Sequence, residues 1–136
     1  MRIGEAAKAA GISERMLRYY EQVGLLPAPA RRTSGYRDYS AADVEAIQFI
    51  RRARALDFPM NEIGHLLDLW REGSPATPEV RDLARKRAHE LHARAEELEA
   101  MRVTLEKLAA SCPADGVQPC SILEALGERE MDTQPA

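Results

Sequence analysis

The residues best suited to chemistry in this chain are its two cysteines, which stand close together in "SCPADGVQPCS". Cys112 and Cys120 are separated by seven residues, two of them prolines and one a glycine. Two thiolates are soft ligands, and they favour monovalent Cu(I), Ag(I) or Au(I), which accept linear coordination by two ligands. Zinc would require about four nitrogen or sulfur ligands, and none of the three histidines is near this segment in sequence.

Other chemistries remain open for the cysteine pair. A thiol–disulfide switch would use the same two residues, although two cysteines in 136 residues are too few for a disulfide framework. A permanent disulfide is disfavoured in the reducing intracellular setting that we expect. Cys120 as an enzyme nucleophile would need a base nearby, and the sequence offers none. His89 and His92, three positions apart, could share a metal or belong to an ordinary polar helix face.

A long helix is expected to carry the first cysteine. Residues 78–110 contain no glycine and no proline except Pro78 itself, which follows the capping residue Thr77 and occupies the favoured first helical position. Apolar residues recur along this helix with a heptad spacing: Leu91, Leu98 and Leu105, with Met101 and Leu108 at the second seam position. This pattern predicts a two-stranded coiled coil and therefore a dimer. A single helix folded against its own N-terminal domain is the alternative.

Cys112 falls on the next seam position of this helix, and Pro113 then ends it. After the loop, Ser121 and Glu124 have the spacing of a capping box and predict a short last helix. Cys120 immediately precedes that helix, whose dipole favours a thiolate and should lower the thiol pKa. A metal ion held by both cysteines would clamp the loop against the long helix.

The first sixty residues predict short helices joined by tight turns. Gly11 ends "IGEAAKAAG", and Ser13 can cap "ERMLRYYEQVG", which together indicate a helix-turn-helix or an ordinary helical hairpin. In "LLPAPARRTSGYRDYS" two short strands, Leu25–Leu26 and Tyr36–Tyr39, could form a wing. Ser40 should cap a third helix, and a fourth should bury Ile63, Leu66, Leu67 and Trp70.

The net charge of −3 conceals an uneven distribution of charge. Residues 1–37 hold seven basic and three acidic side chains, net +4, whereas residues 61–136 hold nine basic and fifteen acidic, net −6. A basic N-terminal part indicates contact with a polyanion. Two groups of side chains could reach DNA bases or phosphates: Arg15, Arg18 and Tyr19 on the second helix, and Arg31, Arg32 and Arg37 around the wing.

Three segments together resemble the MerR family of transcriptional regulators: "IGEAAKAAGISERMLRYYEQVGLL", "SGYRDYS" and "RRARALDFPMNEIGHLL". The resemblance continues into the long helix and covers nearly the whole chain. It implies a mainly α-helical fold, with a winged helix-turn-helix DNA-binding domain over 1–72 and a linker over 73–77. A long antiparallel coiled-coil dimerisation helix would occupy 78–111, a metal-binding loop with a short helix 112–127, and a disordered tail 128–136.

The family implies a homodimer that binds double-stranded promoter DNA and is not an enzyme. On effector binding, such a dimer bends and untwists an overlong promoter spacer so that RNA polymerase can engage both promoter elements. We expect a cytoplasmic protein, because no apolar run is long enough for a membrane helix and the N-terminus is not a secretory signal. By position, the resemblance assigns DNA contacts to Arg18, Tyr19, Tyr20, Tyr36, Arg37 and Arg54. Tyr20 could equally pack inside the domain.

The cysteine segment resembles the metal-binding loop of the copper-responsive branch of this family. Its two ligands fall at the positions of Cys112 and Cys120, which implies one Cu(I), or Ag(I) or Au(I), per subunit. Divalent-metal sensors of the family add a cysteine at the start of the dimer helix, where this chain has Thr77. The iron–sulfur redox branch needs four cysteines in this region, and this chain has two in all. A thiol–disulfide redox sensor using the same cysteines is the alternative function.

Overall fold

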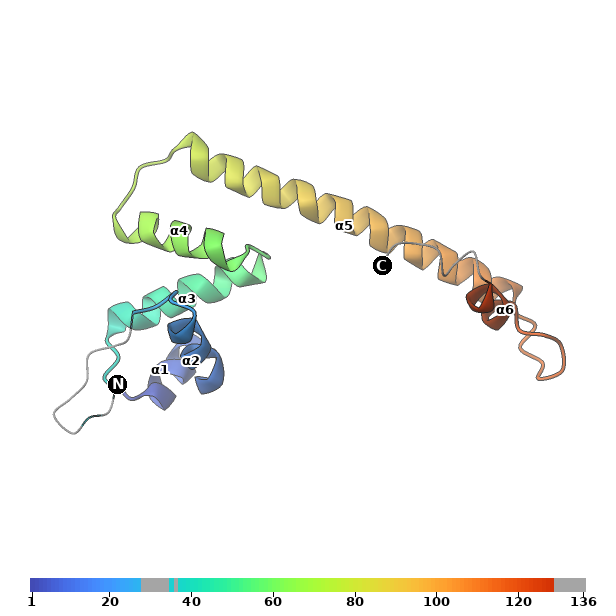
Figure 1. Ribbon diagram of the computed structural model, residues 1–136, viewed down its shortest axis with the longest axis horizontal. Coiled ribbons are helices and arrows are strands. Elements are labelled where there is room, and N and C mark those ends of the chain that lie inside the picture. The colour runs from blue at the N-terminus through green and yellow to red at the C-terminus, as the bar shows by residue number, and fades with distance from the viewer. Residues whose placement is uncertain (28–34, 36, 129–136) are drawn as a thin grey trace. The chain divides into compact units, whose positions relative to one another are not determined.

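The computed structural model describes residues 1–27, 35 and 37–128, and the described part is mainly α-helical (Figure 1). It forms two compact units, Met1–Arg87 and Ala88–Ala136, and one long helix runs through both. The helices are α1 (Ile3–Ala10), α2 (Glu14–Gln22), α3 (Ala41–Ala55), α4 (Met60–Arg71), α5 (Pro78–Ser111) and α6 (Ser121–Gly127). None of the helices in the described ranges is long and apolar enough to cross a membrane.

The turn between α1 and α2 is built as the sequence predicts. Gly11 ends α1 in the left-handed conformation, with φ of 77°, which a residue with a Cβ adopts only at a cost. The Ser13 hydroxyl oxygen accepts a hydrogen bond from the Met16 N–H at 3.1 Å and so caps α2. The Arg51 guanidinium donates to the carbonyls of Ala10 at 3.1 Å and Gly11 at 3.4 Å. An arginine of α3 therefore binds the C-terminal end of α1.

The cap predicted for α3 at Ser40 is present, and Asp43 completes it as a capping box. The Asp43 N–H donates to the Ser40 hydroxyl at 3.1 Å, and the Ser40 N–H donates to the Asp43 carboxylate at 2.8 Å. Two N–H groups that a helix start leaves without partners are thereby satisfied.

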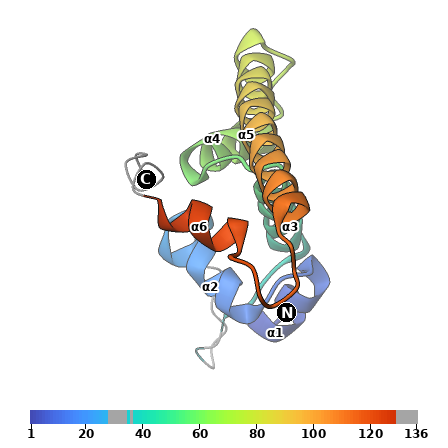
Figure 2. The ribbon, with the colours of Figure 1, turned by 90° about the vertical axis from the view of Figure 1, so that its right-hand side faces the viewer.

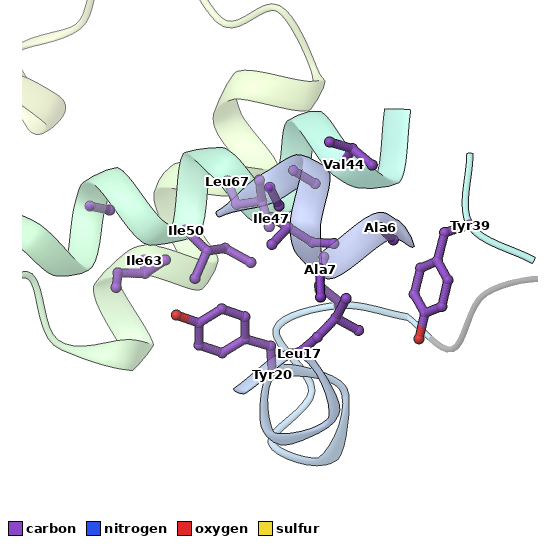
Figure 3. Packing of buried hydrophobic residues seen from close by; sticks show 14 residues of the cluster. Ala6, Ala7, Leu17, Tyr20, Tyr39, Val44, Ile47, Ile50, Ile63 and Leu67 are labelled. Atoms are coloured by element: carbon purple, nitrogen blue, oxygen red, sulfur yellow. The ribbon is translucent and has the colours of Figure 1, made fainter. Parts of the chain in front are cut away.

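The core of the first unit lies where α1, α2, α3 and α4 meet (Figure 3). Its largest completely buried side chains are Leu17, Ile47, Ile50, Ile63 and Leu67. Burying a side chain of this kind contributes about 1.5–3 kcal/mol to folding, so each of these five is a large contributor to the stability of the first unit.

The apolar stripe predicted for α4 is only partly buried. Ile63 and Leu67 are in the core, but Trp70 is 48% exposed. Its ring instead stacks on Phe49 of α3, with ring centroids 4.9 Å apart. The helical period therefore placed Trp70 on the side of α4 that meets α3, but the period does not show how far the core extends along the helix.

The first strand predicted for the wing, Leu25–Leu26, is not a strand, and the described part of the second, residues 37–39, contains only a single β-bridge residue, Arg37. The N–H groups of Leu25 and Leu26 both donate to the Tyr20 carbonyl, at 3.0 and 3.3 Å. They therefore complete the C-terminal end of α2 rather than pair with another strand. Arg31 and Tyr36, both predicted DNA contacts, lie outside the described residues.

The second unit contains most of α5, the loop after it and α6, which lies beside the last turns of α5 (Figure 2). Cys120 is the N-cap of α6, and Ser121 is its first helical residue. The capping box predicted for Ser121 is therefore wrong by one position. The Glu124 N–H donates to the Cys120 carbonyl at 3.0 Å, and the Ser121 hydroxyl is used elsewhere.

Candidate thiol pair and nucleic-acid interface

The two cysteines predicted as metal ligands come together in space. Cys112 follows the last residue of α5, Cys120 precedes α6, and their sulfur atoms are 3.8 Å apart. Both residues are half-buried and neither is in a disulfide. An S–S bond is about 2.05 Å long, so the two sulfur atoms are in non-bonded contact and are not covalently linked.

The start of α6 lowers the pKa of the Cys120 thiol. Backbone N–H groups at the start of α6, that of Leu123 first and that of Ile122 next, lower the pKa of the Cys120 thiol below its usual value. The neighbouring Cys112 thiol lowers it further by hydrogen bonding. The thiolate is the form that binds metals and attacks electrophiles, so a lowered pKa raises the fraction of Cys120 in that form at a given pH.

The loop between the cysteines is organised by one carboxylate. Asp115 accepts hydrogen bonds from the N–H groups of Val117 and Gln118, both at 2.9 Å, and from the Gln118 side-chain amide at 2.8 Å. These donors, with the Gln118 N–H making the largest contribution, lower the pKa of the Asp115 carboxyl. The turn after Cys112 therefore has internal bonds that direct the chain back toward Cys120.

The geometry does not support a metal site at His89 and His92. His92 lies on an exposed face of α5, 3.1 Å from Glu96 one turn away, and His89 is also exposed. In the part of the chain that the structure describes, no group of three or more His, Cys, Asp or Glu side chains is arranged to hold a metal ion.

The exposed face of α2 carries three of the predicted DNA contacts. Arg15, Arg18 and Tyr19 line one shallow hollow together with Glu14 and Gln22. All three predicted contacts are exposed, and Tyr19 is 43% exposed. The face therefore combines two guanidinium groups and a phenol, the donors that commonly bind phosphate oxygens and base edges.

Arg54 of α3 joins this face from a distant part of the sequence. It lines a hollow with Arg15, Met16 and Tyr19. Its guanidinium is 3.8 Å from the Met16 sulfur, and its central carbon is 5.9 Å from the centroid of the Tyr20 ring. The tertiary fold thus brings the predicted contact at Arg54 beside those of α2.

Tyr20 does not share the exposed face. Its side chain is 2% exposed and packs with Leu17 and Ile50 in the core (Figure 3). Tyr20 therefore packs inside the domain, the second of the two roles expected from the sequence. Its side chain could contact DNA directly only by leaving the core. Its ring instead supports the Arg54 guanidinium through a cation–π contact.

Sequence reasoning missed Glu21, which joins α2 to the chain that leads into α3. Its carboxylate accepts a hydrogen bond from the Tyr39 hydroxyl and forms an ion pair with Arg37 at 3.2 Å. Burial, followed by the hydrogen bond and charge of Glu21, raises the pKa of Tyr39 to about 12. The sequence signal that could have identified Glu21 is its negative charge within a basic part of the chain. Arg37, predicted as a DNA contact, is therefore partly engaged within the protein.

Two family profiles match the chain over the parts whose geometry is described above. "MerR HTH family regulatory protein" matches residues 1–70, and "MerR, DNA binding" matches residues 44–108. The chain belongs to the MerR family. Its family and relatives are transcriptional regulators rather than enzymes, as the sequence predicts.

Three relatives show how far the similarity extends. The chain is 42% identical over 128 residues to the HTH-type transcriptional regulator HmrR of Sinorhizobium medicae, covering 94% of this chain and 87% of HmrR. It is 32% identical over 126 residues to the HTH-type transcriptional regulator CueR of Escherichia coli O6:H1, covering 93% of each. The crystal structure of PbrR691 from Ralstonia metallidurans CH34 in complex with lead(II) superposes with a TM-score of 0.77. It is 36% identical and covers 93% of this chain and 98% of PbrR691.

Proposed function

We propose that this MerR-family protein is a cytoplasmic, metal-responsive transcriptional activator of the copper type. In this proposal a homodimer binds double-stranded promoter DNA. One Cu(I), or Ag(I) or Au(I), binds per subunit to Cys112 and Cys120. Metal binding changes how the dimer distorts an overlong promoter spacer, so that RNA polymerase can start transcription of metal efflux or detoxification genes.

The observation that carries the proposal is the approach of the two sulfur atoms to 3.8 Å. A metal–thiolate bond is about 2.3 Å long for zinc. Two bonds of that length span at most about 4.6 Å, so the pair would need to open by less than about 1 Å to hold an ion between its sulfurs. Two thiolates suit a monovalent soft ion, and no third donor from the described residues is arranged with them.

The relatives support a metal effector. One of them, PbrR691, was crystallised with lead(II), which supports metal sensing but not the choice of metal. Lead is divalent, and this chain has Thr77 where the divalent sensors of the family are expected to have a further cysteine. None of the three relatives is named as a redox sensor, so they do not support the thiol–disulfide alternative.

The DNA-binding part of the proposal rests on one composite face. Arg15, Arg18 and Tyr19 of α2 and Arg54 of α3 lie together and are open to a ligand. Guanidinium groups placed on adjacent elements neutralise phosphates, which gives DNA affinity a strong dependence on salt. The sequence and the family resemblance add Arg31, Tyr36 and Arg37 as further proposed contacts.

The proposal of a dimer rests on α5. No residue of this 34-residue helix is buried in the single chain. The heptad residues Leu98, Met101 and Leu105 are each about 60% exposed. A helix with a regular exposed apolar stripe is stabilised by pairing with a second helix, which supports the coiled coil expected from the sequence.

The cysteine assignment is tested by substituting each ligand. Cys112→Ser and Cys120→Ser should abolish Cu(I) induction in an anaerobic transcription assay, because a serine hydroxyl is a poor ligand for a soft ion. Promoter binding, measured by fluorescence anisotropy, should stay within about threefold of the unsubstituted protein, since the changes are far from α2 in sequence.

The matched control is the double variant His89→Ala/His92→Ala, which removes the other candidate ligands and should respond to Cu(I) normally. A normal response in either serine variant would refute the assignment. A loss of response in the histidine variant would move the site to α5.

A further inference from the structure

Two serine hydroxyl groups lie directly beside the cysteine pair. The Ser111 hydroxyl is 3.0 Å from the Leu108 carbonyl and 3.0 Å from the Ser121 hydroxyl. The Ser121 hydroxyl is itself 3.3 Å from the Leu108 carbonyl. Ser111 precedes Cys112, and Ser121 follows Cys120. The hydroxyl contacts therefore tie together the two ends of the loop that carries the thiols.

The end of α5 explains why the hydroxyls gather there. The last four carbonyls of a helix have no partner within it. The Cys112 N–H donates to the Ala109 carbonyl at 3.2 Å, three residues back rather than four, so that N–H is not available to Leu108. The hydroxyls of Ser111 and Ser121 supply donors for the Leu108 carbonyl. Each hydroxyl has one proton and two acceptor lone pairs, so at most two of the three contacts are hydrogen-bonded at any moment.

This role differs from ordinary helix capping. A capping serine accepts a hydrogen bond from an N–H in its own helix, but Cys120 is the N-cap of α6. Ser121 instead reaches out of α6 to α5. Alanine at the exposed position of Ser111, in the last turn of α5, would by itself favour the helix. Loss of the hydroxyls should therefore affect the loop rather than the helices.

We propose that Ser111 and Ser121 form a hydroxyl latch that positions the sulfur atoms of Cys112 and Cys120 for metal capture. This inference rests on the proposed function. The latch joins the end of α5 to the start of α6 before any ion binds. Metal binding then has to order less of the loop between the two cysteines. Ser111 and Ser121 are positioning residues and need not contact the ion.

The first measurement is Cu(I) affinity of the full-length protein, by anaerobic competition with a chromogenic chelator. Ser121→Ala should weaken Cu(I) binding about fivefold, the effect of losing one net hydrogen bond, and Ser111→Ala should have a similar effect. Ser121→Thr keeps the hydroxyl and should bind within about twofold of the unsubstituted protein. Ser74→Ala, the same change in the loop between α4 and α5, should have no effect. Circular dichroism should show equal helix content in all four.

The second measurement needs no metal. In glutathione buffers, one oxidised glutathione is reduced to two glutathione molecules as the Cys112 and Cys120 thiols form one disulfide and give up their protons. The equilibrium yields the effective concentration of one thiol at the other. The latch predicts that Ser121→Ala lowers this effective concentration about fivefold and that Ser121→Thr preserves it.

The two measurements separate the latch from the proposed function. If the unsubstituted protein takes up no Cu(I) while Ser121→Ala still lowers the effective concentration, the latch positions the thiols and the proposed effector is wrong. If Ser121→Ala leaves the effective concentration unchanged, or if Ser121→Thr fails as badly as Ser121→Ala, the latch is overturned.

Discussion

At the scale of single residues, the side chains proposed to contact DNA depend on neighbours that do not themselves face outward. The buried Tyr20 ring lies under Arg54, and the Glu21 carboxylate holds both Arg37 and Tyr39. Glu21 gives a basic segment an internal counter-charge. It also limits the positions that the Arg37 guanidinium can take.

The raised pKa of Tyr39 gives a pH-dependent test of this arrangement. An unfolded tyrosine ionises with a pKa of about 10, whereas the pKa of Tyr39 in the folded protein is raised to about 12. The unfolded state therefore loses its proton first. The neutral phenol contributes its full stability below about pH 10, and this contribution is lost as the pH rises from about 10 to 12.

Glu21→Gln should lower the pKa of Tyr39 toward its ordinary value, because the negative charge beside the hydroxyl is removed. Ultraviolet titration of tyrosinate absorbance, compared with a Tyr39→Phe variant to assign the signal, measures the shift. The chain has only four tyrosines, so the absorbance change of one of them can be assigned by this comparison. A Tyr39 titration that is identical in Glu21→Gln and the unsubstituted protein would contradict the role given to Glu21.

At the scale of elements, the relation of α1 to α3 depends on a close approach at Gly11. A Cβ at this position would meet the Arg51 guanidinium at 1.9 Å, and φ there is 77°. Gly24 has a similar φ of 82°, but a Cβ added there would have no neighbouring atom within 4 Å. A substitution at Gly24 therefore tests backbone strain alone, whereas a substitution at Gly11 tests backbone strain together with the contact to Arg51.

Gly24→Ala should cost about 1 kcal/mol of unfolding free energy from the left-handed backbone alone. Gly11→Ala should cost about 1 kcal/mol more, because it also displaces the Arg51 hydrogen bonds to α1. Urea denaturation measures both. In an Arg51→Ala background the two glycine substitutions should cost the same, and a persistent difference would show that Arg51 is not its cause.

At the scale of the whole molecule, α5 presents a regular stripe of exposed apolar side chains. Its heptad residues are exposed in the single chain, and the described part of the second unit adds only α6 and a loop to this helix. A second copy of α5 would cover this stripe with side chains of the same spacing. In the proposed assembly, a dimer then carries two DNA-facing units and two thiol pairs.

Leu98→Asp should disrupt this dimer, because it places a charge in the seam. Sedimentation velocity should show a shift toward monomer at micromolar concentration. Ala100→Asp adds the same charge two residues away, outside the seam, and should remain dimeric. Equal sedimentation of Leu98→Asp and the unsubstituted protein would exclude this seam as the dimer contact.

The sequence alone determined those features that depend on local spacing. Ser13 and Ser40 were predicted as caps, and the long helix starting at Pro78 was predicted from the absence of breakers. The resemblance supplied the family. The cysteine pair was recognised from residue type and separation, because thiolate chemistry needs no knowledge of the fold to suggest a soft metal.

The tertiary structure alone decided which side chains are shared between elements. Tyr20 and Tyr19 are neighbours in sequence, but helical geometry sends one into the core and leaves the other exposed. The contact of Arg54 with the α2 face, the ion pair of Glu21 and the reach of Ser121 to Leu108 each join residues more than ten positions apart. Such contacts leave no periodic signal in the sequence, because they arise only when separate helices pack.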